Sequence, residues 1–281
     1  MNLKLPELMD SNLTHRKCPV CDTDNANQTA LAYSQAPWEI KECASCGCVY
    51  LENPPTYEAL EEDFAWEKTS AKEEERRKEK RPAAKAVSTA WKQFRQKVLK
   101  RDKLMDLVRV YIPTGNVLDI GCGGGGTLGR LPGEGHVPYG IEISKALAIE
   151  SNRFAEAGGG KVIQASALEG AKQFPEKQFD GVMMSAFLEH EVQPGPLLNE
   201  LHRILKPGGC VIIKVPNYGC VNRSVRGGEW CGFRFPDHVN YFTPESLTRL
   251  AKQTGYEIAR FRFQDRMPTS DNMWVVIQKP A

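Results

Sequence analysis

Four cysteines near the start of the 281-residue chain form two C-x2-C pairs. Cys18 and Cys21 make up the pair in "CPVC", and Cys43 and Cys46 make up the pair in "CASC". Each pair places two thiolates on one face of a tight turn, and two pairs supply the four ligands of a tetrahedral zinc site. Because four sulfurs leave no position for a catalytic water, we predict a structural zinc, with Cys48 as an alternative ligand nearby.

The stretch "NVLDIGCGGGGTLG", residues 116–129, holds a second group of residues with a chemical use. Gly121, Gly123 and Gly126 have the spacing of a dinucleotide-binding loop. Asp119 lies two residues before the first of these glycines, and its carboxylate would repel a diphosphate in a partly desolvated site. A cationic ligand is favoured instead, and S-adenosylmethionine offers both an ammonium and a sulfonium.

Alternating apolar runs and amphipathic segments after residue 115 must position this loop. Strands are expected at 116–120, 137–143, 161–165, 179–185 and 209–216, and helices at 145–157, at 196–205 and from Thr243 onward. This order predicts an α/β fold with a mostly parallel sheet that is covered on both faces. Residues 256–264 and 273–279 are expected to close the sheet as an antiparallel pair, and residues 217–242 are expected to be irregular.

The chain is expected to divide into a zinc-ribbon domain at 1–55, a helical connector at 56–112 and a cofactor-binding domain at 113–281. In the connector, apolar residues repeat at helical spacing between Val87 and Val108, and Pro113 ends the predicted helix. Residues 72–109 carry fourteen Lys or Arg against six Asp or Glu, a net of +8 in a chain of +2. We interpret this as a solvated helix face, and an RNA-binding face is the alternative.

Over residues 111–281 the sequence resembles the class I S-adenosylmethionine-dependent methyltransferases. "VLDIGCGGG" is similar to their glycine loop, "GIEIS" to the acidic end of their second strand, and "LHRILKPGG" to the helix and turn before their fifth strand. "FLEH" and "HVNYFTPESL" are similar to segments of a subgroup that acts on small molecules. The resemblance implies a Rossmann-like sheet with an antiparallel last strand.

The resemblance also implies roles for individual residues in cofactor binding. Gly121 and Gly123 would approach the methionyl group, Asp119 would face its ammonium, and Glu142 would accept hydrogen bonds from both ribose hydroxyls. A carboxylate at a strand end suits that last role in its own right. The remaining cofactor-binding residues are expected beside adenine or near the ammonium: Ile143, Ser166, Ala167, Leu168 and Ser185. Ser166 stands where many relatives carry an aspartate, so it brings no charge to the adenine amine.

Two histidines are candidates for the general base that an oxygen or nitrogen acceptor needs. His190 follows the fourth predicted strand, and His238 lies in the segment after the fifth. Aromatic residues surround His238 in sequence, and we expect them to form the wall of an acceptor pocket: Trp230, Phe233, Phe235 and Tyr241.

These observations predict an enzyme that methylates a small-molecule or sugar-like acceptor, most readily on oxygen or nitrogen. An rRNA or tRNA methyltransferase and a catalytically inactive binding protein are the alternatives, and DNA is not an expected partner. The chain is 41% hydrophobic, has no apolar run long enough to span a bilayer, and begins without the apolar core of a signal peptide. Its nine cysteines suit a reducing compartment, so we expect a cytoplasmic protein.

Overall fold

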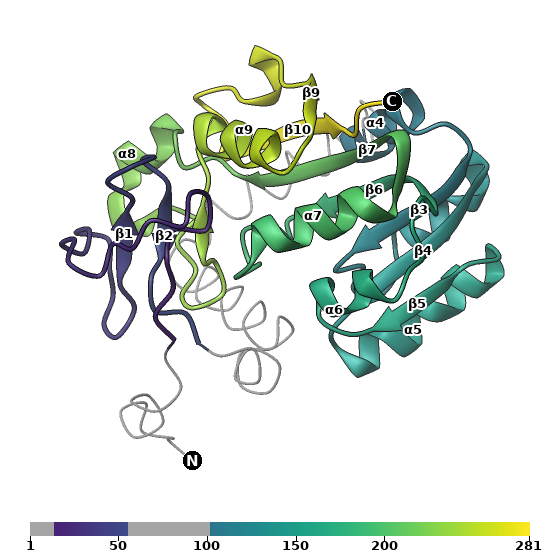
Figure 1. Ribbon diagram of the computed structural model, residues 1–281, viewed down its shortest axis with the longest axis horizontal. Helices are drawn as coiled ribbons and strands as arrows, with labels where there is room; N and C mark the ends of the chain where they lie inside the picture. Colours follow the sequence, from purple (N-terminus) through teal and green to yellow (C-terminus); the bar gives the residue numbers. More distant parts are fainter. Residues whose placement is uncertain (1–13, 56–101) are drawn as a thin grey trace, which may run out of the picture.

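A seven-stranded sheet organises the computed structural model, which describes residues 14–55 and 102–281 (Figure 1). The strand order is β5-β4-β3-β6-β7-β10-β9, in which neighbours from β5 to β7 are parallel and β10 is antiparallel to both β7 and β9. The bounds are Gly115–Ile120 for β3, His136–Glu142 for β4, Lys161–Gln164 for β5, Phe179–Ser185 for β6, Leu205–Pro216 for β7, Glu257–Arg260 for β9 and Asn272–Gln278 for β10. The predicted α/β fold with an antiparallel last strand is confirmed.

Helices cover both faces of this sheet, because successive side chains of its buried strands point to opposite sides. Leu118 of β3 lies in a core cluster with apolar side chains of α6, α7 and α9, whereas Val117 lies in a second cluster with side chains of α4 and α5. The helices are α4 (Lys103–Tyr111), α5 (Lys145–Ala157), α6 (Ala167–Lys172), α7 (Pro194–Ile204), α8 (Val221–Arg226) and α9 (Pro244–Gln253). Short 3-10 turns occupy Leu128–Arg130, Pro132–Glu134, Gly227–Glu229 and Phe263–Asp265.

Local sequence signals fix several helix ends. The Thr243 hydroxyl accepts a hydrogen bond from the Ser246 amide, and the Ser246 hydroxyl accepts one from the Thr243 amide. This pair of bonds forms a capping box at the start of α9. At the other end of the connector, α4 stops at Tyr111 because Ile112 is extended, as a residue before a proline tends to be. The part of the predicted helix that precedes residue 102, and most of the basic segment 72–109, lie outside the described residues.

A second, three-stranded sheet joins the N-terminal unit to the main domain. It contains β1 (Ile40–Glu42), β2 (Val49–Leu51) and β8 (Asn240–Tyr241), in that order. β8 belongs to the segment after β7 and pairs antiparallel with β2, so that Tyr241 lies opposite Val49. Figure 1 shows these purple and green strands together at one end of the molecule. We expected residues 217–242 to be irregular, but they contain α8 and β8.

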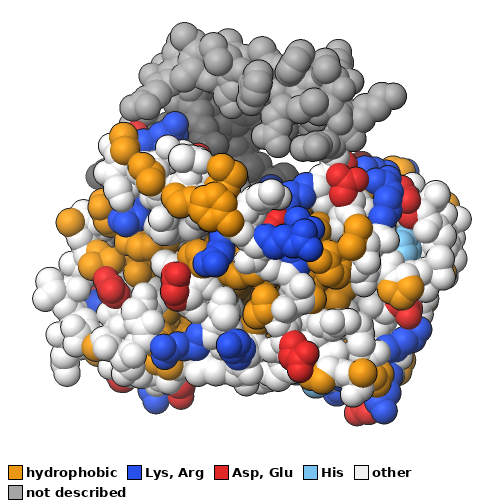
Figure 2. All heavy atoms as spheres, turned by 90° about the horizontal axis from the view of Figure 1, so that it is seen from above, with side chains coloured by type: hydrophobic (Ala, Val, Ile, Leu, Met, Phe, Trp, Pro, Cys, Tyr) orange, Lys and Arg blue, Asp and Glu red, His pale blue; other side chains and the backbone are white. Residues whose placement is uncertain are grey.

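Within the described ranges, no helix is both long enough and apolar enough to cross a membrane. The domain boundaries at 55 and 112 stay predictions. On the face shown in Figure 2, Lys and Arg side chains of the described residues are dispersed among acidic and apolar ones.

Candidate active site

The glycine loop leaves β3 at the carboxyl edge of the sheet and has a backbone that favours glycine. Gly121 and Gly123 have φ angles of +68° and +53°. A Cβ atom on Gly121 would lie 2.6 Å from Cδ2 of Phe187, whereas a Cβ on Gly123 would meet no atom within 4 Å among the described residues. The loop therefore offers open space beside Gly123, which a side chain would fill and a ligand can occupy.

Two buried carboxyl groups lie beside this space. Glu142, at the end of β4, accepts hydrogen bonds from the amide of Gly123 at 2.8 Å and the amide of Ser144 at 2.9 Å. Each carboxylate oxygen keeps acceptor capacity for one hydroxyl of a ribose. Burial raises the pKa of Asp119 to about 7, with a further contribution from the charge of Glu142. A cationic ligand group would lower that pKa again, so this donor set fits S-adenosylmethionine.

The other predicted cofactor residues lie on neighbouring strands of the same edge. Ile143 directly follows β4, Ser166 is the N-cap residue of α6 after β5, and Ser185 ends β6. Ala167 is buried, whereas Leu168 is half-buried. Because β3, β4, β5 and β6 are parallel, their carboxyl ends meet here, so the sheet brings the cofactor candidates together.

His190, His238 and a residue that sequence reasoning missed, Glu189, form a tight cluster after β6. One oxygen of Glu189 and one ring nitrogen of each histidine all lie within 4.8 Å of one another. The two imidazole rings meet edge to face, with centroids 4.7 Å apart. Nδ1 of His190 donates to the carbonyl of Asp237 at 2.9 Å, and Nδ1 of His238 donates to the carbonyl of Gly232 at 2.8 Å.

These hydrogen bonds place a proton on Nδ1 of both rings, because a carbonyl oxygen can only accept. Nε2 carries the lone pair when the ring is neutral. Burial, with a smaller contribution from the charge of Arg234, lowers the pKa of His190 to about 4. His190 is therefore neutral at physiological pH.

Glu189 is the more unusual member of the cluster. It is only 1% exposed, its Oε2 atom has no hydrogen-bond partner among residues 14–55 and 102–281, and burial raises its pKa to about 8. The sequence signal was present in "FLEH", where an acidic residue precedes His190 just after a strand. A carboxyl group with this pKa can exchange a proton near neutral pH, and the donor atoms of Glu189, His190 and His238 are close enough together to hold a divalent cation.

The aromatic residues around His238 are placed differently from our expectation. Trp230 and Tyr241 are 1% and 2% exposed, and with Phe233 they pack against apolar side chains of the N-terminal unit, among them Trp38. They form a core rather than the expected pocket wall, because they cover the small sheet that β8 completes. Phe235 is half-buried and stacks on Phe233, and its place in an acceptor pocket stays a prediction.

The four cysteines of the predicted zinc site lie together in the N-terminal unit. Sγ of Cys18 lies 3.5 Å from Sγ of Cys46, Sγ of Cys21 lies 3.4 Å from Sγ of Cys43, and all four sulfurs lie within 4.8 Å of one another. A tetrahedral zinc with sulfurs at about 2.3 Å separates them by about 3.8 Å, so the residues fit the ion. The buried Cys48 is not a member of this group of four.

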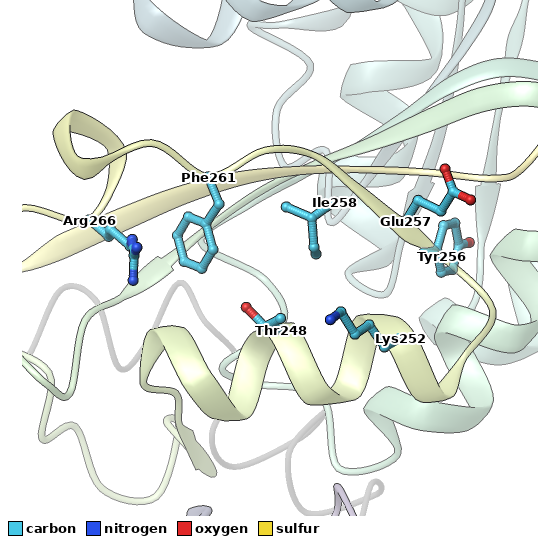
Figure 3. Close-up of a pocket in the computed structure, with 7 residues that line it drawn as sticks. All are labelled: Thr248, Lys252, Tyr256, Glu257, Ile258, Phe261 and Arg266. Atoms are coloured by element: carbon cyan, nitrogen blue, oxygen red, sulfur yellow. The ribbon is translucent and has the colours of Figure 1, made fainter.

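A pocket of about 440 Å³ lies elsewhere, between α9 and β9 (Figure 3). Figure 3 shows Thr248 and Lys252 on the helix, facing Ile258 and Phe261 on the chain opposite. β9 is the last strand of the sheet, four places from the strand that carries the glycine loop. None of the predicted site residues lines this pocket.

Known proteins resemble about half of this chain in sequence. It is 30% identical over 148 residues to a ubiquinone biosynthesis O-methyltransferase of Thiobacillus denitrificans, and 36% identical over 155 residues to one of Pseudomonas syringae pv. tomato. Each alignment covers 50% of this chain and 64% of the relative. The chain thus spans somewhat less than two thirds of the length of these relatives.

Solved structures share the fold. An S-adenosylmethionine-dependent methyltransferase from Mesorhizobium loti superposes with a TM-score of 0.51 at 16% identity, covering 64% of this chain and 100% of its own. The PH0226 protein of Pyrococcus horikoshii gives 0.51 at 21% identity, covering 63% of this chain and 88% of its own. The family model described as a methyltransferase domain matches residues 76–260. Because this match covers more than half of the chain, the protein belongs to that methyltransferase family and has the fold of the class I S-adenosylmethionine-dependent enzymes.

Proposed function

We propose that the protein transfers the methyl group of S-adenosylmethionine to an oxygen atom of a small-molecule acceptor. The observation that carries this proposal is the pairing of two features at one sheet edge. The glycine loop with Asp119 and Glu142 suits the cofactor, and the cluster of Glu189, His190 and His238 suits an acceptor that must lose a proton. The relatives named as ubiquinone biosynthesis O-methyltransferases support oxygen as the methylated atom.

The contact between Gly121 and Phe187 relates these two features in space. Phe187 lies three residues before His190, and its ring packs where a Cβ of Gly121 would lie. β3 and β6 are hydrogen-bonded neighbours, so the chain segments that leave them start side by side. We therefore propose that the cluster lies on the acceptor side of the methyl group.

When bound, the cofactor supplies an activated methyl group, so the protein's own residues mainly bind, orient and exclude water. Asp119 and Glu142 bind the ammonium and the ribose in this proposal. A phenol hydroxyl has an ordinary pKa near 10. Glu189, with a pKa of about 8, accepts its proton more readily than His190, with a pKa of about 4. We therefore propose Glu189 as the proton acceptor, with His238 and His190 as the groups that contact and orient the hydroxyl.

We also propose that Cys18, Cys21, Cys43 and Cys46 hold one structural zinc. Four thiolates complete the coordination of the ion, so it takes no part in the chemical step.

Methyl transfer by the purified full-length chain tests the function. Formation of S-adenosylhomocysteine is measured with catechol-type phenols, with nucleotide sugars and with total tRNA and rRNA as separate acceptors. We expect turnover with the phenols, and methylation of RNA alone would contradict the proposal.

Variants of the cluster test the assigned roles. Glu189→Gln should lower kcat roughly 100-fold, a usual contribution of a general base, while calorimetry shows unchanged cofactor affinity. His238→Ala should also lower kcat at unchanged cofactor affinity, because the acceptor hydroxyl loses a group that orients it. His202→Ala is the control, because His202 packs against Tyr256 away from the cluster. Unchanged turnover in Glu189→Gln would remove Glu189 from the mechanism.

A further inference from the structure

Arg16 connects the N-terminal unit with both chain segments that carry the cluster. It lies two residues before Cys18, and its Nε donates to the carbonyl of Leu51 at the end of β2 at 2.7 Å. Nη1 donates to the carbonyl of Val192 at 3.0 Å, and Nη2 donates to the carbonyl of Val239. Val192 lies two residues after His190, and Val239 directly follows His238, so one guanidinium holds both segments.

Asn240 completes the connection between these segments. Its Oδ1 accepts from Nη2 of Arg16 at 3.0 Å, and its Nδ2 donates to the carbonyls of Leu188 at 2.9 Å and Glu191 at 2.7 Å. The amides of Val239 and Asn240 both donate to the carbonyl of Glu189, at 2.8 and 3.0 Å. Asn240 is 1% exposed, so these bonds form away from water. The two segments are thus cross-linked on the side that Arg16 contacts.

The contacts of Arg16 extend in the other direction to the four-cysteine group. Its guanidinium lies 5.3 Å from the ring centroid of Tyr50, whose hydroxyl accepts from Nδ2 of Asn25 at 3.0 Å. Oδ1 of Asn25 accepts from the amide of Ala44 at 3.1 Å, and Ala44 lies in the turn between Cys43 and Cys46. A continuous set of contacts therefore runs from this cysteine turn to the cluster.

The chemistry of the side chain explains why an arginine stands here. The planar guanidinium presents five N–H donors in a fixed fork and can serve several carbonyl groups at once. A lysine carries the same charge on one tetrahedral nitrogen and cannot span acceptors on three separate segments. Without these donors, the carbonyls of Val192 and Val239 would lose partners that the structure provides for them.

We infer that Arg16 is a positioning residue through which the cysteine unit holds Glu189, His190 and His238 in their relative places. A structural change at the four cysteines should therefore alter the relative positions of these three side chains. The inference rests on the proposed function only in assuming that the cluster lies next to the methyl acceptor. Its test requires no acceptor molecule.

The first arm of the test uses the ring signals of the histidines in ¹⁵N NMR spectra of the zinc-loaded full chain. In Arg16→Ala, the signals of His190 and His238 should move, while those of His136 and His202 stay in place. Lys17→Ala is the matched control, because Lys17 is the exposed neighbour of Arg16 and should move none of these signals. Added guanidinium ion should return the two signals toward their wild-type positions, which it would not do if the variant had only unfolded.

Arg16→Lys is a second variant that tests the inference even if Arg16→Ala does not fold. It keeps the charge and should move the same two signals without rescue by guanidinium, because the lysine side chain occupies the space. Unmoved His190 and His238 signals in this folded variant would overturn the inference. So would equal movement of all the histidine signals.

The second arm removes the metal with a chelator. In the wild type this should move the signals of His190 and His238, and in Arg16→Ala it should move them no further, because the connection is already lost. Equal movement in both proteins would overturn the inference. Absence of methyl transfer by the wild-type protein, with the expected NMR result intact, would contradict the proposed function and leave the role of Arg16 standing.

Discussion

Replacing Gly123 by alanine separates the cost of backbone strain from the loss of ligand space. Its φ of +53° lies in the left-handed region, where an alanine costs about 1 to 2 kcal/mol. Its Cβ would contact no atom of the described residues within 4 Å, so no clash within the described part of the fold adds to that cost. A free energy of unfolding lower by this amount corresponds to a Tm lower by about 2–4 °C for each kcal/mol.

The effect on cofactor binding should be larger than the strain explains. The new methyl group enters the space in which we place the cofactor, and forcing an extra methyl group into a packed contact costs about 1 to 3 kcal/mol. This corresponds to an affinity for S-adenosylmethionine that is about 5- to 150-fold weaker. Isothermal titration calorimetry measures the affinity, and thermal unfolding without ligand measures the strain.

Gly208→Ala is the matched control for this prediction. Gly208 has a φ of +76° and equally open space at its Cβ, but it lies near the start of β7, away from the glycine loop. Its alanine variant should lose similar stability and keep its cofactor affinity. If both variants bound the cofactor as the wild type does, the cofactor would not occupy the space beside Gly123.

Three further predictions concern the same molecule. Because the pKa of Asp119 is raised from 3.8 to about 7, the stability of the ligand-free protein should fall as the pH rises from about 4 to about 7 and then level off, whereas cofactor affinity should increase as the pH rises through 7 and this carboxyl ionises. Calorimetry with Asp119→Asn should show a flat pH profile of cofactor affinity instead. Glu142→Ala should weaken cofactor binding by about 1.5 to 3 kcal/mol, as for charged hydrogen bonds, whereas Glu156→Ala, at an exposed position near the C-terminal end of α5, should bind normally in the same titration. Metal analysis should find about one zinc per chain, as expected for a single four-ligand site, and Cys46→Ser should lose it. Retention of zinc by Cys46→Ser, or loss of zinc in the control variant Cys48→Ser, would refute the ligand assignment.

Local patterns allowed the main sheet to be predicted from the sequence. The expected strand at 179–185 and the expected helix at 145–157 agree with β6 and α5, because a run buried on both faces and a capped amphipathic segment are each determined by nearby residues. The start of α9 at Pro244 likewise follows from the Thr243 cap. The cofactor candidates lie at the ends of these strands or in the segments that directly follow them, and their roles stay predictions.

The acceptor side could not be predicted in the same way. β8 has only two residues, and its pairing with β2 depends on a contact between distant parts of the chain. The burial of Trp230 follows from that pairing. From the sequence alone, the aromatic residues of this segment suggested the wall of an open pocket, whereas in the structure they pack in a core. Glu189 looked like an ordinary acidic residue, because its raised pKa comes from burial that only the tertiary structure creates.

The pairing of β2 with β8 has a consequence for the order in which the protein folds during synthesis. The cysteine unit leaves the ribosome early, but the strand that completes its sheet is made only when most of the chain has emerged. Until then the unit has only the short hairpin of β1 and β2, and a two-stranded hairpin is marginally stable in water. Binding of the proposed zinc would stabilise the unit at that stage. If the cysteines hold this ion, the N-terminal unit should acquire it early and its full structure late, with the unpaired edge of β2 exposed in between.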